Sequence, residues 1–550
     1  MNQIPFLRDQ HLAQLPAETF DLLVIGGGAT GAGIALDAAA RGLRVALAEK
    51  QDFAAGTSSR STKLIHGGLR YLKQMEFKLV REVGLERATV HRLAPHLVVA
   101  EKMLLPLIKN GTYGRLMTQI GLQVYDILAG VTGSDRRVML SAAQTLEKEP
   151  LLRADLVEGG GFYAEYRTDD ARLVTELIKT AAARGAVCVN YLEVKDFIYE
   201  KGQVAGAICE DRIGASTLEI RARQVVNAAG PWVDELRSQN GSLKNKRLHL
   251  TKGVHIVVPH ERLPLRQSVY FDVPDGRMLF AIPRGKSTYI GTTDTDYQGS
   301  KEQPLITAED VQYLIKGTHA IFPSAGLTEA DVVSSWAGLR PLIHEEGKSA
   351  SELSRKDEIF ISPSGLISIA GGKLTGYRKM AERVVNRVAR QLQQQARRAF
   401  ARCQTKHIVL AGGQFADAQA VTAFQASIFE RLGPAGFTRQ DAAYLVHNYG
   451  TQVPDILDLM EQPTAEGLVL AELAFGLEHE MVQTPVDFWV RRTGRLYFDI
   501  GSVYQHKNRV LEAMKAHFGW SDDRTQALAA ELEQAIGQAT RFPAQAEMVH

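Results

Sequence analysis

The chain has little of several features that would place it in a specialised class of protein. It contains only 3 cysteines in 550 residues, Cys188, Cys209 and Cys403, and they lack the close spacing of metal-binding motifs. We therefore expect no disulfide framework and no metal site, as in a protein of the reducing cytosol. The chain contains no run of about 18 apolar residues, so we expect no membrane-spanning helix. The N-terminus does not show the basic-then-apolar order of a secretory signal, so we expect none.

The chain also lacks an excess of charge of one sign. Its 64 Lys and Arg residues nearly balance its 62 Asp and Glu residues, which leaves a formal net charge of +2. Together with the absence of basic repeats interleaved with aromatics, this balance predicts no nucleic-acid partner. The 45% hydrophobic and 23% charged fractions are those of an ordinary globular protein. A chain of this length is expected to form about two or three domains.

The most informative segment runs from residue 21 to residue 50, DLLVIGGGATGAGIALDAAARGLRVALAEK. Leu22–Ile25 is a short apolar run typical of a buried parallel strand, and Arg44–Ala48 is a second one. Between them, Ala32–Arg41 has the small-residue pattern of a tightly packed helix. The order strand, turn, helix, strand predicts a dinucleotide-binding unit, and a glycine-rich turn without a ligand is the weaker alternative.

Three glycines and one carboxylate stand where a dinucleotide requires them. Gly26, Gly28 and Gly31 follow the G-x-G-x-x-G spacing, in which the first glycine allows a tight turn, the second admits a pyrophosphate and the third lets the helix approach the strand. Glu49 ends the second strand, where a carboxylate binds the ribose hydroxyls of an adenosine. This pattern alone is shared by NAD and FAD sites.

The following segment favours FAD. Residues 52–75, DFAAGTSSRSTKLIHGGLRYLKQM, are rich in Gly, Ser, Thr and His, and they predict a polar loop along an extended cofactor, with a helix from about Leu69. A nicotinamide dehydrogenase would continue into an ordinary helix and strand. Ser58, Ser59 and Ser61 can bond the phosphates or the ribityl hydroxyls, although plain loop polarity would also explain them.

The rest of the chain predicts three structural layers. The helical pattern of Asp170–Arg184 and the strands Ala186–Asn190, Val204–Glu210, Gln224–Asn227 and Leu366–Ile369 are expected to extend a parallel sheet. Residues 245–335 alternate apolar and polar side chains, which predicts an antiparallel sheet. Beyond Arg402 the periodicity is helical, with expected helices at Asp441–Asn448, Ala465–Glu478, Val503–His517 and Thr525–Gln538.

Several motifs together resemble one enzyme family. IGGGATGAGIALDAAARGLRVALAEK and GGKLTGYRKMAE (371–382) are similar to the two signature segments of the FAD-dependent (aerobic, respiratory) glycerol-3-phosphate dehydrogenases. The segments SSRSTKLIHGGLRYL, NAAGPWVD, TKGVHIVVP, IGTTDTDY and SWAGLRPLIHEE also match this family, in family order. The resemblance covers about residues 20 to 520.

The resemblance implies both a fold and a reaction. The fold is a glycine oxidase-like α/β flavoprotein, with an FAD-binding parallel-sheet domain, an interleaved antiparallel-sheet substrate cap and a helical C-terminal domain. The expected bounds are 20–95, 155–240 and 336–400 for the FAD-binding domain, 96–154 and 241–335 for the cap, and 405–550 for the C-terminal domain. The implied reaction oxidises sn-glycerol 3-phosphate to dihydroxyacetone phosphate by hydride transfer to FAD.

The resemblance also assigns residues to the substrate phosphate. By motif match, the expected substrate-binding residues are Arg70, Tyr71, Arg340, Arg355 and Lys373. Arginine suits a phosphate dianion because its planar fork makes two parallel hydrogen bonds. Arg355 matches less specifically than Arg340 and Lys373, and surface charge remains an alternative for it. Arg340 and Lys373, which flank the reacting centre, are also expected to take part in catalysis.

The proton acceptor and the remaining cofactor contacts are expected near the flavin. His255 lies in an apolar strand and is the preferred general base, because imidazole titrates near neutral pH; a hydrogen-bonded core histidine is the alternative. His66 is expected to contact the flavin and is the second candidate base. The other expected cofactor contacts are Ala228, Gly230, Gly372 and Thr375, the last of which starts a helix whose N–H dipoles favour negative charge on the flavin.

The electron acceptor implied by the resemblance is a membrane quinone, with oxygen, as in a glycerol-3-phosphate oxidase, as the alternative. Oxidases of this kind tend to carry an insert in the cap, and Leu305–Leu339 leaves little room for one. A quinone acceptor implies a cytoplasmic protein bound peripherally to the inner face of the cell membrane. Residues 98–131, with Lys102, Lys109 and Arg115, are one candidate for the membrane surface, and a buried helical pair in the cap is the other interpretation. The sequence leaves a homodimer open.

Overall fold

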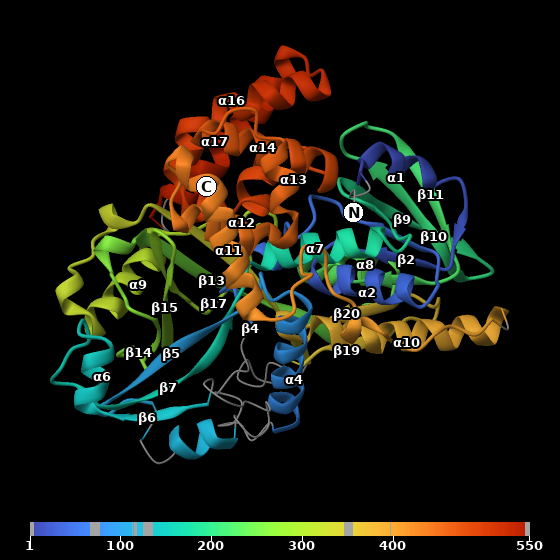
Figure 1. The fold of residues 1–550 in the computed structure, drawn as a ribbon. Helices are drawn as coiled ribbons and strands as arrows, with labels where there is room; N and C mark the ends of the chain where they lie inside the picture. The colour runs from blue at the N-terminus through green and yellow to red at the C-terminus, as the bar shows by residue number, and fades with distance from the viewer. Residues whose placement is uncertain are drawn as a thin grey trace.

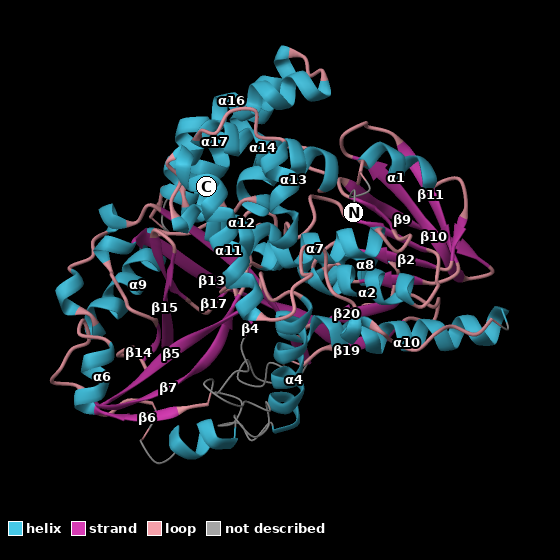
Figure 2. Ribbon diagram, viewed as in Figure 1, coloured by secondary structure: helices cyan, strands magenta, loops and turns pink. Residues whose placement is uncertain are grey.

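The computed structural model describes residues 5–65, 77–112, 114, 118–124, 136–345, 356–396 and 398–544. These residues form an α/β part, a large sheet beside it and a helical C-terminal part that lies across both (Figure 1; Figure 2). The predicted class of fold is thereby confirmed. Among the described residues, no helix is long and apolar enough to cross a bilayer.

A six-stranded sheet carries the dinucleotide-binding unit. Its order is β19 (Glu358–Ile361), β20 (Ile367–Ala370), β12 (Val225–Asn227), β2 (Leu22–Ile25), β3 (Val45–Ala48) and β8 (Val187–Val189). All neighbours from β20 to β8 pair in parallel. Every residue of β2 and β3 is buried, which accounts for their uninterrupted apolar sequences. A second, four-stranded sheet contains β1 (Thr19–Phe20), β11 (Thr217–Ala222), β10 (Gln203–Asp211) and β9 (Leu192–Glu200). The strand expected at Val204–Glu210 is β10, which pairs antiparallel with β11 and β9, so its expected place in the parallel sheet is wrong.

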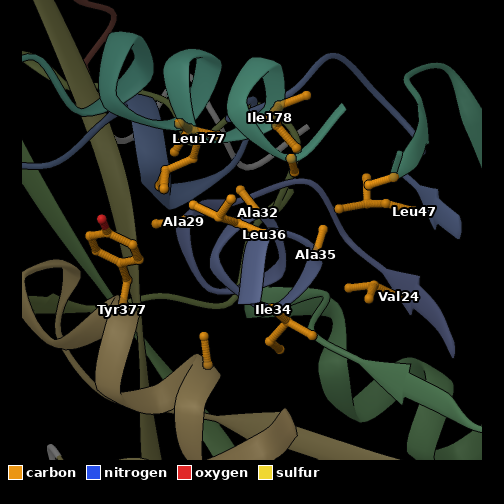
Figure 3. Packing of buried hydrophobic residues seen from close by; sticks show 14 of the residues in the cluster. Val24, Ala29, Ala32, Ile34, Ala35, Leu36, Leu47, Leu177, Ile178 and Tyr377 are labelled. Carbon is orange, nitrogen blue, oxygen red and sulfur yellow. The ribbon is translucent and has the colours of Figure 1, made fainter. Parts of the chain in front are cut away.

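Small residues let helix α2 (Ala29–Ala40) pack closely between two other helices. It lies between α7 (Asp170–Ala182) and α10 (Tyr377–Ala396), as Figure 3 shows for Leu177 on one side and Tyr377 on the other. A Cβ atom on Gly33 would lie 2.9 Å from the Tyr377 ring. The alanine and glycine residues of α2 therefore fix where its N-terminus meets the sheet. Two further helices of this part are α1 (Arg8–Gln14) and α8 (Val233–Gln239).

The cap is built on a ten-stranded sheet. Its order is β17 (Thr295–Asp296), β13 (Lys246–Pro259), β16 (Ser287–Gly291), β15 (Met278–Arg284), β14 (Ser268–Asp272), β5 (Val99–Ile108), β7 (Val157–Arg167) and β4 (Leu64–Ile65); β18 (Ser334–Glu345) pairs with β13, and β6 (Val138–Ser141) pairs with β7. The helices α6 (Ala142–Lys148) and α9 (Ala308–Ile321) pack against this sheet, whereas α4 (Phe77–Leu93) packs mainly against the segment that leads into α10. The antiparallel strands expected between residues 245 and 335 are confirmed.

Three strands depart from the expected domain bounds. β4 was expected in the FAD-binding domain, but it pairs with β7 in the cap sheet. β7 was expected in the FAD-binding domain, but it pairs with β5 over most of its length and belongs to the cap sheet. β18 was expected largely in the FAD-binding domain as well, and it pairs with β13 from Ser334 to Glu345. The motif carried by β18 points to the cofactor, whereas its hydrogen bonds are made with the cap. Motif content and sheet membership are therefore separate properties of this strand.

Residues 98–131 were interpreted either as a membrane surface or as a buried helical pair. Their first half forms the strand β5 and fits neither interpretation. β5 lies between β14 and β7, and Leu104 and Leu105 on it are 0% and 1% exposed. The apolar cluster of β5 is thus the core of the cap, neither an interfacial surface nor a helix. A strand covered on both faces has the same apolar composition as an interfacial segment, which explains the error. Arg115 lies outside the described residues.

The C-terminal part is helical, as expected. Its helices are α11 (Ala418–Leu432), α12 (Arg439–Tyr449), α13 (Val453–Asp458), α14 (Ala465–His479), a π-helical turn (Asp487–Arg492), α15 (Arg495–Phe498), α16 (Ile500–Phe518) and α17 (Asp522–Thr540). α12, α14, α16 and α17 confirm the four predicted helices. The sequence did not reveal α11 and α13.

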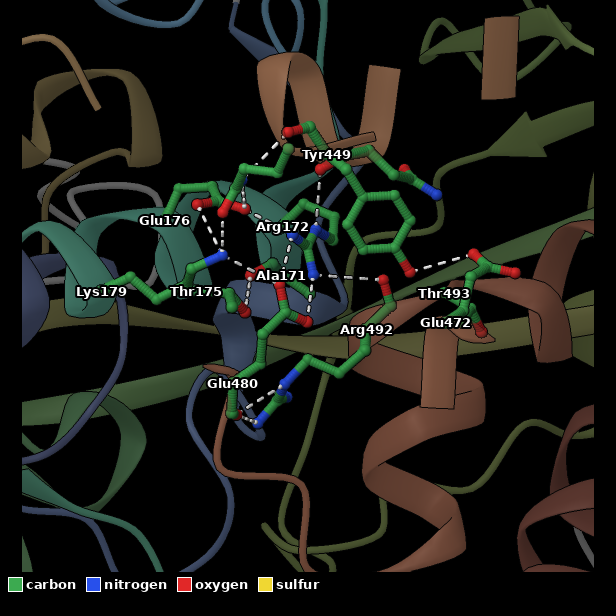
Figure 4. A network of polar contacts seen from close by, with 12 residues as sticks. Ala171, Arg172, Thr175, Glu176, Lys179, Tyr449, Glu472, Glu480, Arg492 and Thr493 are labelled. Carbon is green, nitrogen blue, oxygen red and sulfur yellow. Dashed lines mark hydrogen bonds and ion pairs between the residues drawn. The ribbon is translucent and has the colours of Figure 1, made fainter. Parts of the chain in front are cut away.

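Buried ion pairs join the C-terminal part to α7. Nη1 of Arg172 lies 2.7 Å from Oε2 of Glu480, and Nζ of Lys179 lies 3.2 Å from Oε1 of the same residue (Figure 4). Glu176 pairs with Arg172 one turn along α7, and Arg492 donates to the Glu480 carbonyl at 2.8 Å. All of these side chains are buried. Removing one partner would leave a buried charge uncompensated, so the docking is specific.

Candidate active site

Glu49 is held at the edge of the glycine turn by two backbone hydrogen bonds. Its Oε2 accepts from the N–H of Gly27 at 2.6 Å, and its Oε1 accepts from the N–H of Gln51 at 2.8 Å. Burial raises the pKa of Glu49, and these two N–H groups act in the opposite direction. A carboxylate has about four acceptor positions, so each oxygen can still accept from a ribose hydroxyl.

The three fingerprint glycines are required for different reasons. Gly26 has φ +110°, and a Cβ there would lie 2.6 Å from the carbonyl oxygen of Ala228; a Cβ on Gly31 would lie 1.8 Å from the carbonyl oxygen of Gly26. Packing within the protein therefore demands both. Gly28 has an ordinary φ of −80°, and the nearest atom to its Cβ would be Oγ of Ser58 at 3.1 Å.

Gly28 therefore tests whether a dinucleotide fits the site. The fold does not require a glycine at this position, but a group lying against the turn would. Gly28 is the N-cap of α2 and has no side chain to cap it, and it lines the cavity together with Ala29 and Thr30, the first residues of the helix. This is the cradle that a pyrophosphate occupies, and the residues present fit FAD.

The loop after β3 supplies one wall of the cavity. Ser58 accepts a hydrogen bond from the N–H of Ala29 at 3.0 Å and lines the cavity together with Ser61. Ser59 differs from the expectation, because it is 1% exposed and does not line the cavity. Its carbonyl accepts from Nζ of Lys63 at 3.2 Å instead. The turn of 3-10 helix at Thr57–Ser59 points successive side chains in different directions, which separates Ser59 from Ser58.

A second wall comes from the turns after β12 and β20. Ala228 and Gly230 line the cavity on one side of it, and Gly372 and Thr375 line it where the chain enters α10. Gly371 and Gly372 have φ of +73° and +83°, a backbone conformation that favours glycine. The two turns follow neighbouring parallel strands, so they meet at the carboxyl edge of the sheet, where such sheets bind ligands.

Arg340 lies on β18 at the opposite end of the cavity. Its Nη1 donates to Oδ1 of Asp294 at 3.0 Å, and its Nη2 donates to Oγ1 of Thr292 at 2.9 Å. A Cβ on Gly253 of the adjacent strand would lie 2.3 Å from Nη2, so that glycine makes room for the guanidinium. Lys373 lines the same cavity. The cavity wall therefore carries two cations, and a dianionic ligand requires such charges.

His255 is buried against the same end. It is 1% exposed, its ring stacks on Trp336 at 4.8 Å between centroids, and its Nε2 lies 3.0 Å from Oγ1 of Thr62. Nδ1 is buried and has no hydrogen-bond partner among the described residues. Burial lowers the pKa of His255 well below its usual value, and the charges of Arg340 and Lys63 lower it further. The lowered pKa favours the neutral imidazole, which is the form that has a lone pair to accept a proton.

These residues line one continuous cavity of about 360 Å³. It runs from Glu49 and the glycine turn, past Ser58 and Ser61, to His255 and Arg340. The arrangement can hold an extended dinucleotide in a cavity whose wall also carries the base His255 and the cations Arg340 and Lys373. Of the remaining predicted site residues, His66, Arg70, Tyr71 and Arg355 lie outside the described residues.

The structure also brings forward residues that the sequence did not single out: Arg60 and Thr62 line the cavity, and Trp336 lies behind its wall. Arg60 lines the cavity, donates to the Glu302 carbonyl at 3.0 Å, and has a pKa lowered by burial. Thr62 contacts His255, and Trp336 fixes the adjoining backbone by donating from Nε1 to the carbonyl of Ser61 at 3.0 Å. Each of the three lies inside a quoted motif, SSRST or SWAGLRP, but nothing in the sequence showed which motif positions face the cavity.

Two protein families match most of the chain. The family described as FAD dependent oxidoreductase matches residues 21–378, and the family described as C-terminal domain of alpha-glycerophosphate oxidase matches residues 403–525. The chain is 52% identical to the aerobic glycerol-3-phosphate dehydrogenase of Bacillus subtilis (strain 168) over 94% of each chain. It is 47% identical to the protein of the same name from Staphylococcus aureus (strain USA300) over 97% of each chain.

Solved structures give the same result. The glycerol-3-phosphate dehydrogenase from Bacillus halodurans, complexed with FAD, has a TM-score of 0.83 and 46% identity, with 97% of both chains covered. Glycine oxidase from Bacillus cereus ATCC 14579 has a TM-score of 0.51 at 20% identity, over 67% of this chain and 97% of that chain. The second similarity concerns the fold alone, and it confirms the predicted glycine oxidase-like architecture.

Proposed function

The chain belongs to the FAD-dependent aerobic glycerol-3-phosphate dehydrogenases, and from this membership we propose that it oxidises sn-glycerol 3-phosphate to dihydroxyacetone phosphate. The observation that carries the proposal is the pairing, within one cavity, of the dinucleotide cradle at Gly28 with the buried base His255 and the cations Arg340 and Lys373. FAD, when bound, supplies the two-electron oxidation of the substrate carbinol.

The side chains at the substrate end have separate roles in this proposal. Arg340 and Lys373 hold the phosphate dianion. The missing side chain of Gly253 leaves the space that the guanidinium of Arg340 occupies. Nε2 of His255, next to Thr62 at the cavity wall, accepts the proton of the C2 hydroxyl. The stacked Trp336 keeps water from the imidazole and holds its plane. Arg70, Tyr71 and Arg355 remain proposed phosphate contacts on the motif match alone.

At the cofactor end, the proposal assigns the remaining contacts along the cavity. Glu49 binds the adenosine ribose, and the α2 N-terminus with Gly28 holds the pyrophosphate. Ser58 and Ser61 face the phosphates and the ribityl chain, and Gly372 and Thr375 lie at the flavin end. Ala228 and Gly230 pass close to the cofactor without side chains that would block it.

We further propose that electrons pass from FAD to a membrane quinone. The higher identity to dehydrogenases, 52% and 46%, supports this acceptor, whereas a solved L-alpha-glycerophosphate oxidase from Mycoplasma pneumoniae is 20% identical over 68% of this chain. A quinone acceptor requires an enzyme that touches the membrane, and the proposal places this enzyme in the cytoplasm at the inner face. The match of residues 403–525 to an oxidase C-terminal domain favours oxygen as the second candidate acceptor.

One pair of assays separates the two acceptors. The purified, FAD-loaded chain is given glycerol 3-phosphate with a soluble quinone analogue without oxygen, and then with air alone while peroxide is measured. Turnover that is fast with the quinone and slow in air, with little peroxide, is the expected result. Fast turnover in air with one peroxide per substrate would establish the oxidase, and no turnover with either acceptor would refute the proposed substrate.

A further inference from the structure

One carboxylate of the α/β part, which carries the dinucleotide-binding unit, is paired with two arginines of the C-terminal part. Asp52 is fully buried and stands three residues after Glu49. Its Oδ2 lies 2.5 Å from Nε of Arg491 and 2.7 Å from Nη1 of Arg492, and its Oδ1 lies 2.8 Å from Nη2 of Arg492. Burial alone would raise the pKa of Asp52, but the guanidinium charges of Arg492 and Arg491 outweigh burial and lower it to about 2.

A second contact of Asp52 comes from the cofactor part itself. Nδ2 of Asn190, just after β8, donates to Oδ1 of Asp52 at 3.0 Å, and it also donates to the carbonyl of Met481 at 3.0 Å. The carboxylate therefore lies in a cage shared by both parts. Paired on both oxygens with charged donors, it has one orientation, because each alternative would leave a buried charge without a partner.

Asp52 begins a tight turn that touches the glycine turn. The N–H of Ala55 donates to the carbonyl of Asp52 at 3.1 Å, and the N–H of Ala54 donates to the carbonyl of Gly27 at 3.0 Å. The ring of Phe53 lies where a Cβ on Gly27 would approach within 2.8 Å. The position of Asp52 is therefore transmitted directly to the pyrophosphate cradle by backbone hydrogen bonds and packing.

The turn is held in an unfavourable backbone conformation. Ala54 has φ +64°, in the left-handed region that a residue with a Cβ rarely adopts. Such a conformation persists only where the surroundings fix it from both sides. Here Asp52 fixes one side and the hydrogen bond to Gly27 fixes the other, and the chain then continues into residues 56–61, most of which line the cavity.

We propose that Arg491 and Arg492 act as positioning residues for FAD: through Asp52 they hold the cofactor loop, residues 52–61, against the glycine turn. The C-terminal domain thereby takes part in FAD retention without touching the cofactor cradle. The proposal rests on the FAD dependence of the family and does not depend on which substrate is oxidised.

The experiment compares FAD release from variants of the full chain. Holoenzyme is diluted in the absence of substrate, and the fluorescence of released flavin is followed well below each unfolding temperature. For Asp52→Asn, which keeps the side-chain shape and removes the charge, release is expected to be about tenfold faster or more, since a charge-assisted contact is lost. Arg492→Lys keeps the charge but loses the two-pronged contact, so an intermediate rate is expected.

A buried pair inside the C-terminal domain provides the matched control. Nη2 of Arg495 lies 2.5 Å from Oε2 of Glu472, with side-chain exposures of 10% and 0%. Glu472→Gln disrupts a comparable ion pair in the same domain without contacting Asp52. This variant is expected to lower the unfolding temperature and to release FAD at the wild-type rate. Added FAD should restore Asp52→Asn to the wild-type kcat, with an unchanged KM for glycerol 3-phosphate.

Two results would overturn the proposal. One is wild-type FAD release from Arg492→Lys and from Asp52→Asn. The other is equal acceleration in Glu472→Gln, which would make FAD loss a general consequence of a weakened C-terminal domain. If Asp52→Asn does not accumulate as folded protein, Arg492→Lys decides alone, because it leaves the buried charges balanced. Failure of the glycerol 3-phosphate assay would leave these release rates unaffected, so the two proposals fail separately.

Discussion

The two ends of the cavity differ in the groups that form them: backbone groups beside glycines at one end, and side chains at the other. At the adenosine end, Gly26, Gly28 and Gly31 matter because they have no side chain, and the contacts come from backbone N–H groups. At the substrate end, Arg340 and His255 matter because of the side chains that they bring from separate strands of the cap. The first end is therefore sensitive to added atoms, and the second is sensitive to lost charge. Predictions that add or remove atoms test this difference directly.

The largest effect is expected from adding atoms at Gly28. Gly28→Val places a side chain where the pyrophosphate lies, so the purified protein should be colourless and inactive, with its fold retained. Flavin absorbance measures the cofactor content, and circular dichroism measures whether the fold is retained. Gly501→Val is the control, because a Cβ there meets no atom within 4 Å. Full flavin content in Gly28→Val would show that the adenosine end does not depend on the missing side chain.

Removing the base should have the next largest effect. His255→Gln is expected to lower kcat by about 10²- to 10⁴-fold, the usual contribution of a general base, with FAD content unchanged. His249→Gln on the same strand β13 is partly exposed and should keep wild-type turnover. A wild-type kcat in His255→Gln would transfer the role of base to another group, with His66 as the next candidate.

Removing the phosphate cation should have a smaller effect, confined to the substrate. A charge-assisted contact is worth about 1.5–3 kcal/mol, so Arg340→Ala should lower kcat/KM for glycerol 3-phosphate by about 10- to 150-fold. FAD content should not change. Glycerol, which has no phosphate, should be an equally poor substrate of the variant and the wild type. An equal loss with both substrates would show that Arg340 serves the cap structure instead of the phosphate.

The smallest expected effect is a pH dependence of stability. Because the folded-state pKa of His255 lies well below the unfolded value of about 6.5, the neutral imidazole favours folding. This contribution is complete above about pH 6.5, and it declines as the pH falls toward the folded-state pKa. The Tm difference between wild type and His255→Gln should therefore be larger at pH 8 than at pH 5. A difference that grows on acidification would mean that the folded protein binds a proton at His255.

The same contrast explains how much of the molecule the sequence predicted. Strands β2 and β3, the glycine turn and Glu49 were predictable, because their apolar runs and spacings act over a few tens of residues. The bounds of β18 were not predictable from its motif, since one strand carries residues toward the cofactor and hydrogen-bonds to the cap. Burial of β5 on both faces was not distinguishable from an interfacial segment by composition alone.

The sequence predicted which motifs form the candidate site, but it did not predict which side chains of these motifs face the cavity. Arg340 and His255 lie in recognisable motifs, and the structure places both in the cavity. Ser59 was expected beside Ser58 but points into the protein, because local turn geometry decides which hydroxyl faces a ligand. Arg60 and Thr62 gave no signal of their own. The pairing of Asp52 with Arg492 spans 440 residues, and no periodicity carries information over that distance.

That distance also sets an order of events during protein synthesis. A ribosome adding about 5–20 residues per second needs roughly 20 to 90 s to proceed from Asp52 to Arg492. During this interval the glycine turn has already been synthesised, while the carboxylate of Asp52 beside it lacks both of its arginines. Stable flavin incorporation therefore belongs to the end of translation. A product that terminates before Arg491 contains the complete glycine turn and the complete cap, but it lacks both arginines. It should therefore be colourless.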